Sequence, residues 1–243
     1  MSQSTIPLGI LKNTQYRSYD PLREVDEQLK PLVNLVLAGS NLADDEALAL
    51  ARSSFQDLGA LCHIASTIRD RGKGRIVSFS PKVFIPLTQL CRDFCGYCTF
   101  RKSPSQSDRL YVTPEEALEI AQAGERMGCT EALFTLGERP EERYIQARQW
   151  LQDNGYDSTL EYLRHVSNTI LNKTSLLPHG NPGTMSRENL KSLKEVNVSV
   201  GVMLEILSQR LCELGGPHAL APSKWPGIRL RTMDLAGELK FPF

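Results

Sequence analysis

The sequence contains no apolar run that approaches the roughly 20 residues needed to cross a bilayer, and it has no surplus of charge of either sign. Its 28 basic residues balance 28 acidic ones, which argues against nucleic acid or an acidic membrane surface as a partner. Residues 1–13 lack the basic end and continuous apolar core of a signal peptide. These absences predict a cytoplasmic protein with no membrane or nucleic-acid partner.

Cysteine is scarce as well, since six in 243 residues are too few for a disulfide scaffold. Cys62, Cys129 and Cys212 stand alone and are interpreted as small buried apolar side chains. The sequence also lacks the dinucleotide-binding G-x-G-x-x-G and the P-loop G-x-x-x-x-G-K-[ST]. We therefore expect the chemistry at the other three cysteines, which fall within eight residues.

Two regions are expected along the chain. Prolines interrupt any long helix in residues 1–42, and a helical pattern then runs from Asp44 to about Asp70 before glycines end it. This pattern predicts an N-terminal helical extension over residues 1–75, without catalytic residues of its own. Residues 76–243 form the predicted core domain.

In the core domain, short apolar strands alternate with helices. Strands are expected at residues 83–87, 131–136, 176–179 and 196–204, with a last one beginning at 239–243. This alternation implies parallel strands joined by crossover helices, in an α/β barrel or a doubly wound sheet. Functional-looking residues follow several different strands, which favours a TIM-like (β/α) barrel. Because the chain ends inside the last expected strand, we expect a partial barrel.

The clustered cysteines, Cys91, Cys95 and Cys98, have the spacing C-x3-C-x2-C. Three thiolates can hold three irons of a [4Fe-4S] cluster and leave the fourth iron open to a small molecule. Gly96 permits the tight loop that this needs, and Tyr97 offers an aromatic face beside the cluster. The spacing therefore predicts a cluster with one free coordination site.

Three alternative roles for these cysteines stay open. A structural zinc site normally uses four ligands, and the next histidine, His165, is far along the chain. A ferredoxin-like site needs a fourth cysteine, for which Cys129 is the candidate. The three thiols could also be unrelated buried side chains, although the spacing disfavours that.

The cysteine motif, with an aromatic residue before its last cysteine, resembles the signature of the radical S-adenosylmethionine (SAM) superfamily. The resemblance implies a [4Fe-4S] cluster and SAM as cofactors, and a reducing partner such as flavodoxin or ferredoxin. It also implies that electron transfer from the cluster cleaves the SAM sulfonium to a 5′-deoxyadenosyl radical. The protein would orient the cofactor and exclude water.

The same resemblance implies a cofactor-binding set of Tyr97, Glu138, Glu205 and Arg229. Glu138, in the string GERP after the second expected strand, would accept hydrogen bonds from the methionine ammonium. Glu205 would contact the ribose hydroxyls and Arg229 the methionine carboxylate. Each also has a plain alternative: a turn for Glu138, a helix-terminal acid for Glu205 and a solvent-facing side chain for Arg229.

The catalytic residues are unknown, and two histidines are candidates. His179 follows the third expected strand, and His218 lies in a Gly-Gly-Pro-His loop. Either could bind substrate or move a proton near neutral pH, although a lone loop histidine more often does neither.

Further strings narrow the resemblance to the deazaflavin-forming family, and within it to the cyclising subunit of 8-hydroxy-5-deazariboflavin (Fo) synthase. They are FIPLT, CTFR, FTLGERPE, LPH, NPG and GGPH, in this order between residues 84 and 218. The resemblance implies that a partner radical SAM subunit joins the hydroxybenzyl group of tyrosine to a ribitylaminouracil. The cyclising enzyme then takes a hydrogen atom from that adduct, closes the ring and releases ammonia, which makes it a lyase.

This sequence departs from the family at its end, because relatives continue with a glycine-rich stretch that helps to hold the adenine. Two alternative functions stay open. One is a sister radical SAM enzyme, either the tyrosine-using partner subunit or a biotin-synthase-like enzyme. The second is a non-catalytic iron–sulfur or zinc protein.

Overall fold

The computed structural model describes residues 20–243, so the expectation about a signal peptide at residues 1–13 lies outside the described part. The chain divides into two compact units, one ending at Ser78 and the other spanning Phe79–Phe243. Each unit has its own apolar core. No helix within residues 20–243 is long and apolar enough to cross a membrane.

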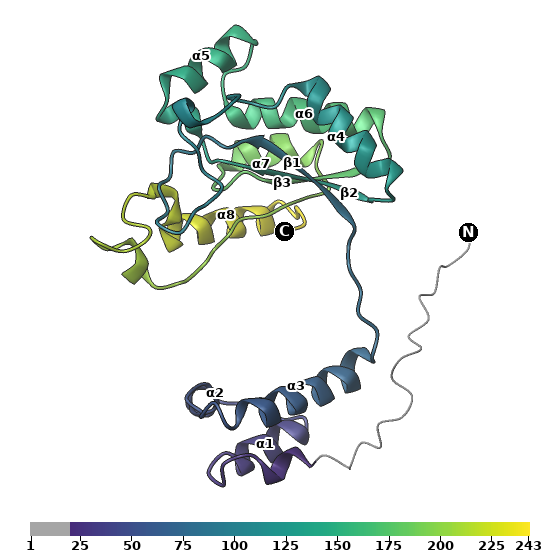
Figure 1. The fold of residues 1–243 in the computed structure, drawn as a ribbon, viewed down its shortest axis with the longest axis vertical. Helices are drawn as coiled ribbons and strands as arrows, with labels where there is room; N and C mark the ends of the chain where they lie inside the picture. Colours follow the sequence, from purple (N-terminus) through teal and green to yellow (C-terminus); the bar gives the residue numbers. More distant parts are fainter. Residues whose placement is uncertain (1–19) are drawn as a thin grey trace. The chain divides into compact units, whose positions relative to one another are not determined.

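The first unit, over its described residues 20–78, is built from the turn η1 (Pro21–Arg23) and the helices α1 (Lys30–Leu37), α2 (Asp44–Ala51) and α3 (Leu58–Lys73) (Figure 1). The single helical stretch expected from Asp44 to about Asp70 is therefore two helices. Between them, the Asp57 carboxylate accepts hydrogen bonds from the Ser54 and Asp26 amides at 3.0 and 2.8 Å. This side-chain bonding competes with helical hydrogen bonds and breaks the helix.

The second unit contains a parallel sheet of β1 (Lys82–Thr88), β2 (Glu131–Leu136), β3 (Leu177–Asn181) and β4 (Ser199–Val200). The strands lie in chain order, β1-β2-β3-β4. A barrel wall has this order, whereas a doubly wound sheet reverses its order at a switch point. The α/β fold and the TIM-like arrangement predicted from the sequence are thus confirmed.

Five helices of the second unit connect or follow these strands within residues 79–243. They are α4 (Pro114–Arg126), α5 (Ile145–Asp153), α6 (Thr159–Lys173), α7 (Arg187–Lys194) and α8 (Pro226–Glu238). The first helix starts where the sequence predicts it, because Thr113 and Glu116 form a capping box. Figure 1 shows α4 and α6 together on one face of the sheet.

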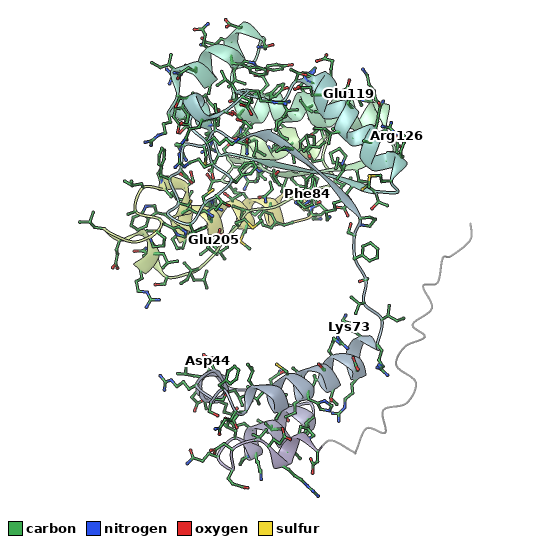
Figure 2. All side chains as sticks on the ribbon, viewed as in Figure 1. Asp44, Lys73, Phe84, Glu119, Arg126 and Glu205 are labelled. Atoms are coloured by element: carbon green, nitrogen blue, oxygen red, sulfur yellow. The ribbon has the colours of Figure 1, made fainter. Side chains whose placement is uncertain are left out.

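The two faces of the sheet differ in burial. Ile85, Leu87 and Phe134 are fully buried in the core beneath the helices. Phe84 points to the other face, opposite α4, and remains 59% exposed (Figure 2). Alternate residues of a strand face opposite sides of a sheet, so a strand with alternating buried and exposed side chains belongs to a sheet that helices cover on one side. The exposed face corresponds to the interior of a barrel.

Two expected strands are corrected by the structure. The strand expected at residues 196–204 is reduced to Ser199–Val200, and the chain then runs irregularly to Glu205, whose φ is 66°. The strand expected to begin at 239–243 is absent, because the chain turns after α8 and Phe241 enters the core. Pro242 has no N–H to donate to a sheet, although its carbonyl accepts the Val200 amide at 3.0 Å.

Candidate active site

A cavity of about 260 Å³ lies at the carboxyl ends of β1, β2 and β3. In a parallel α/β barrel this is the end at which functional side chains gather. The three predicted cluster ligands, Cys91, Cys95 and Cys98, all line it. So do the four residues of the predicted cofactor-binding set, Tyr97, Glu138, Glu205 and Arg229.

The cysteine loop follows directly after β1 and is fixed by backbone hydrogen bonds to a distant segment. The Gly96 amide donates to the Pro217 carbonyl at 2.7 Å, and the Phe94 amide donates to Leu220 at 2.9 Å. A Cβ on Gly96 would lie in ordinary van der Waals contact with Pro217, 3.4 Å from its Cα, so the two segments are packed against each other. The conformation of the loop is therefore set before any cofactor binds.

The thiols are half-buried and face the cavity without forming disulfides. Burial raises the pKa of Cys91 to about 11 and also raises the pKa of Cys95, so both are protonated near neutral pH. The Cys91 Sγ accepts the Glu138 amide at 3.2 Å, and the Cys98 Sγ accepts the Arg101 amide at 3.4 Å. Amide donors of this kind stabilise sulfur that carries negative charge or binds metal.

Two of the alternatives, a single zinc ion and a cluster with Cys129 as its fourth ligand, can be compared with the described part of the chain. Within residues 20–243, no three His, Cys, Asp or Glu side chains are placed to hold one metal ion. A cubane cluster differs from a single ion, because each thiolate binds a different iron. Cys129 does not line the cavity; it packs against the apolar core next to the end of α4.

Glu138 and Arg229 form a buried pair at the cavity wall, with relative exposures of 5% and 3%. The Glu138 Oε1 accepts hydrogen bonds from the amide and hydroxyl of Thr184, and its Oε2 lies 3.4 Å from Arg229 Nη2. Burial raises the pKa of Glu138, while Thr184 and Arg229 act in the opposite direction. Arg229 Nε and Nη1 donate to the Ser223 and Met203 carbonyls at 2.8 and 2.6 Å.

Two glycines let Glu138 occupy this position. A Cβ on Gly137 would overlap the Leu90 carbonyl, so the backbone approaches the cysteine loop closely only with glycine there. Gly183 has a φ of 90°, and a Cβ on it would overlap the Glu138 carboxylate. These contacts give a physical reason for the glycines of the strings GERP and NPG.

Tyr97 and Glu205 line the cavity from two separate segments. The Tyr97 hydroxyl lies 2.8 Å from His218 Nε2, and Glu205 binds Lys224 Nζ at 2.6 Å. Burial raises the pKa of Tyr97, with Glu205 acting in the same direction. Burial alone would raise the pKa of Glu205, but Lys224 and Tyr97 hold it below its usual value. Glu205 comes from the irregular segment after β4 (Figure 2).

Neither candidate histidine lines the cavity. His218 is almost fully buried behind Tyr97, and its Nδ1 has no hydrogen-bond partner in the described part of the chain. His179 lies on β3, with Nδ1 2.6 Å from the Ser199 hydroxyl. Burial lowers the pKa of both histidines. They are thus more often neutral at pH 7 than an exposed histidine.

Sequence reasoning missed three charged residues of the cavity wall, Asp93, Arg101 and Lys224. Arg101 is the last residue of the string CTFR, one of the strings that carry the family resemblance, but the resemblance assigned it no role. Asp93 lies inside the cysteine motif. Lys224 carries no sequence signal, because only folding brings it to Glu205.

Comparison with known proteins fits this geometry. The sequence profile of the radical SAM superfamily matches residues 85–242, and the chain belongs to that superfamily. Its cofactors are accordingly a [4Fe-4S] cluster and SAM.

The curated relatives are more specific. The chain is 49% identical over 168 residues to the 7,8-didemethyl-8-hydroxy-5-deazariboflavin synthase of Methanopyrus kandleri, a match that covers 69% of this chain and 50% of the relative. It is 47% identical over 215 residues to the FO synthase of Nocardia farcinica, which covers 84% of this chain and 25% of that relative. The chain thus spans half or less of the length of these relatives.

Solved structures agree on the fold. The hydrogenase maturase HydG of Carboxydothermus hydrogenoformans superposes with a TM-score of 0.67 at 22% identity, over 87% of this chain and 46% of that one. Methylornithine synthase (PylB) gives 0.62 at 18% identity, over 85% of this chain and 56% of that one. Identities this low support the architecture alone.

Proposed function

We propose that this chain is the cyclising enzyme, or the cyclising part of a longer enzyme, that forms the deazaflavin chromophore Fo. The observation that carries the proposal is the single cavity lined by the three thiols and the four predicted cofactor-binding residues. The 49% identity to a deazariboflavin synthase supports the choice of substrate. The substrate is then an adduct of a hydroxybenzyl group with ribitylaminouracil, and the reaction is a ring closure that releases ammonia.

In this proposal Cys91, Cys95 and Cys98 bind three irons of the cluster. Their fit rests on the shared cavity and on the amides that already donate to two of the sulfurs. The bound cluster would supply the electron that cleaves the SAM sulfonium, and SAM would supply the 5′-deoxyadenosyl group that takes a hydrogen atom from the substrate. A low-potential reductant such as flavodoxin or ferredoxin is the expected electron donor, since cleaving a sulfonium needs a strongly reducing cluster.

Glu138 is proposed to bind the methionine ammonium of SAM, because it is a carboxylate already held in one orientation by Thr184 and Arg229. Arg229 also acts through Glu138, because one of its N–H groups binds that carboxylate and two more bind the Ser223 and Met203 carbonyls. Its other N–H groups on Nη1 and Nη2 are proposed to donate to the SAM carboxylate, since Arg229 lines the cavity.

Glu205 and Tyr97 are proposed to contact the nucleoside of SAM. Lys224 keeps Glu205 ionised and therefore an acceptor for ribose hydroxyls. His218 is proposed to hold the Tyr97 ring through its hydrogen bond. His179, on the uncovered side of the sheet beside Ser199, remains a candidate contact for the substrate.

The test is anaerobic reconstitution followed by turnover. The expected result is about four irons per chain, release of 5′-deoxyadenosine, and conversion of the adduct to a fluorescent deazaflavin. One zinc and no SAM cleavage would contradict the enzyme. Cleavage with tyrosine and free ribitylaminouracil as substrates, but not with the adduct, would assign the chain to the partner activity.

A further inference from the structure

The charged side chains of the cavity are satisfied by protein partners, with one exception in the described part of the chain. Glu138 pairs with Arg229, and Glu205 pairs with Lys224. Asp93 accepts the Ser223 amide at 3.2 Å. Arg101 lines the same cavity, but its guanidinium has no hydrogen bond or ion pair within residues 20–243.

Burial makes the isolation of Arg101 more costly. Its Nε is shielded from solvent and has no partner in the described residues. A buried donor without an acceptor loses the full benefit of its hydration. No Nη group of Arg101 has a hydrogen-bond partner within residues 20–243 either, and because Arg101 lines the cavity these groups are the donors available to an acceptor that enters it.

Aromatic packing holds the guanidinium carbon of Arg101 against the Phe94 ring. The Arg101 Cζ lies 3.7 Å from the centroid of the Phe94 ring, and the Arg143 Cζ lies 3.8 Å from the same centroid. The backbone of Phe94 is held in turn by the hydrogen bond that its amide donates to the Leu220 carbonyl. A guanidinium held against an aromatic ring still has N–H groups to donate, and their fork geometry matches planar groups that carry two oxygens.

We propose that Arg101 binds the substrate by donating N–H bonds to oxygens of a planar group. This inference rests on the proposed function, in which the planar group is the pyrimidinedione of the ribitylaminouracil portion. The two protein-bound charge pairs are assigned to SAM, so Arg101 is the charged group left for a second ligand. Phe94 lies between Cys91 and Cys95, so the contact between Arg101 and Phe94 places the bound substrate next to the cysteine loop.

The experiment measures the affinity of ribitylaminouracil by anaerobic calorimetry, with SAM present. It uses the longest natural form of the chain, loaded with its cluster. Arg101→Gln should weaken binding by about tenfold or more, the scale of a charge-assisted bidentate contact. Arg101→Lys, which keeps the charge but loses the planar edge, should be intermediate.

Arg143→Gln is the matched control, because Arg143 stacks on the same ring but does not line the cavity. It should change the affinity for ribitylaminouracil by no more than about twofold. SAM affinity and cluster absorbance should be unchanged in all three variants. If Arg101→Gln does not fold, Arg101→Lys alone must still weaken the uracil and spare SAM.

Three results would overturn the assignment. Wild-type affinity for ribitylaminouracil in the Arg101 variants would leave Arg101 without a ligand role. Weakened SAM binding with unchanged uracil binding would make Arg101 a cofactor contact, through the methionine carboxylate. If the wild type converts the adduct to a deazaflavin but does not bind ribitylaminouracil, the proposed function stands and the Arg101 assignment fails; if it cleaves SAM but leaves the adduct unconverted, the proposed function itself fails.

Discussion

Replacing Glu138 by glutamine tests the cofactor site most directly. The change keeps the shape of the side chain but removes the charge opposite Arg229. Removing one partner of a buried ion pair typically costs about 3–5 kcal/mol. Here the pair is 3.4 Å apart, and Arg229 retains its bonds to Ser223 and Met203. We therefore expect the free energy of unfolding to fall by only about 1–3 kcal/mol.

SAM binding should weaken by a similar amount, because glutamine cannot offer a charged acceptor to the methionine ammonium. A loss of about 1–3 kcal/mol corresponds to a roughly 5- to 150-fold increase in Kd. The assay is a titration of the cluster-loaded protein with SAM under anaerobic conditions, with urea unfolding in parallel. Cluster absorbance should be unaffected, since Glu138 touches Cys91 only through its backbone amide.

Glu195→Gln is the control for this prediction. Glu195 pairs with Arg164, but the two side chains are 65% and 42% exposed and neither lines the cavity. An exposed pair contributes about 0–1 kcal/mol, so both stability and SAM affinity should stay close to wild type. Unchanged SAM affinity in Glu138→Gln would refute the reasoning and leave Glu138 as a structural residue of the turn.

Four more perturbations test the site and its support. Alanine at Cys91, Cys95 or Cys98 should abolish the brown cluster absorbance at about 400 nm, and alanine at Cys62, Cys129 or Cys212 should not; loss with Cys129→Ala would favour a ferredoxin-like site. Gly183→Ala should weaken SAM binding, because its Cβ meets the Glu138 carboxylate, whereas Gly155→Ala, at a similar φ of 81° but in open space, should lower stability alone. Lys82 and Ser80 lower the pKa of Glu131, so these contacts stabilise the fold above pH 4.5 and stop doing so as the pH falls further. In urea unfolding, the free energy of unfolding of Glu131→Gln should therefore lack this contribution to its fall at acid pH. Tyr97→Phe and His218→Gln should affect SAM affinity non-additively, with a coupling of about 0.5–3 kcal/mol; strict additivity would break the proposed link between them.

The elements with strong local signals are predictable from the sequence. Strand β2 has the bounds that the sequence predicts, because an apolar run follows Gly128 and leads to Gly137. Helix α4 starts as predicted because its capping box is contained in four consecutive residues. The cysteine loop is also predictable from the sequence, because its three cysteines lie within eight consecutive residues.

The elements that the sequence predicts wrongly depend on contacts distant in sequence. Residues 239–243 have strand-like composition, but the turn after α8 and the burial of Phe241 override it. The sequence cannot show that Arg101 lacks an ion-pair partner either, because that depends on which cations the nearby carboxylates bind in the folded chain. Glu138 and Arg229 are 91 residues apart, and nothing local indicates that one will bind the other.

The shortness of β4 follows from the same long-range requirements. A longer strand would direct the backbone carbonyls after Val200 toward a neighbouring strand. In the structure the irregular segment instead points the Met203 carbonyl at Arg229, and carbonyls farther along the chain bind the cysteine loop, where Pro217 accepts Gly96 and Leu220 accepts Phe94. The apolar run at 196–204 therefore favours a strand locally, while the site needs its acceptors elsewhere. Irregular backbone is tolerated here because each of these carbonyls has a donor.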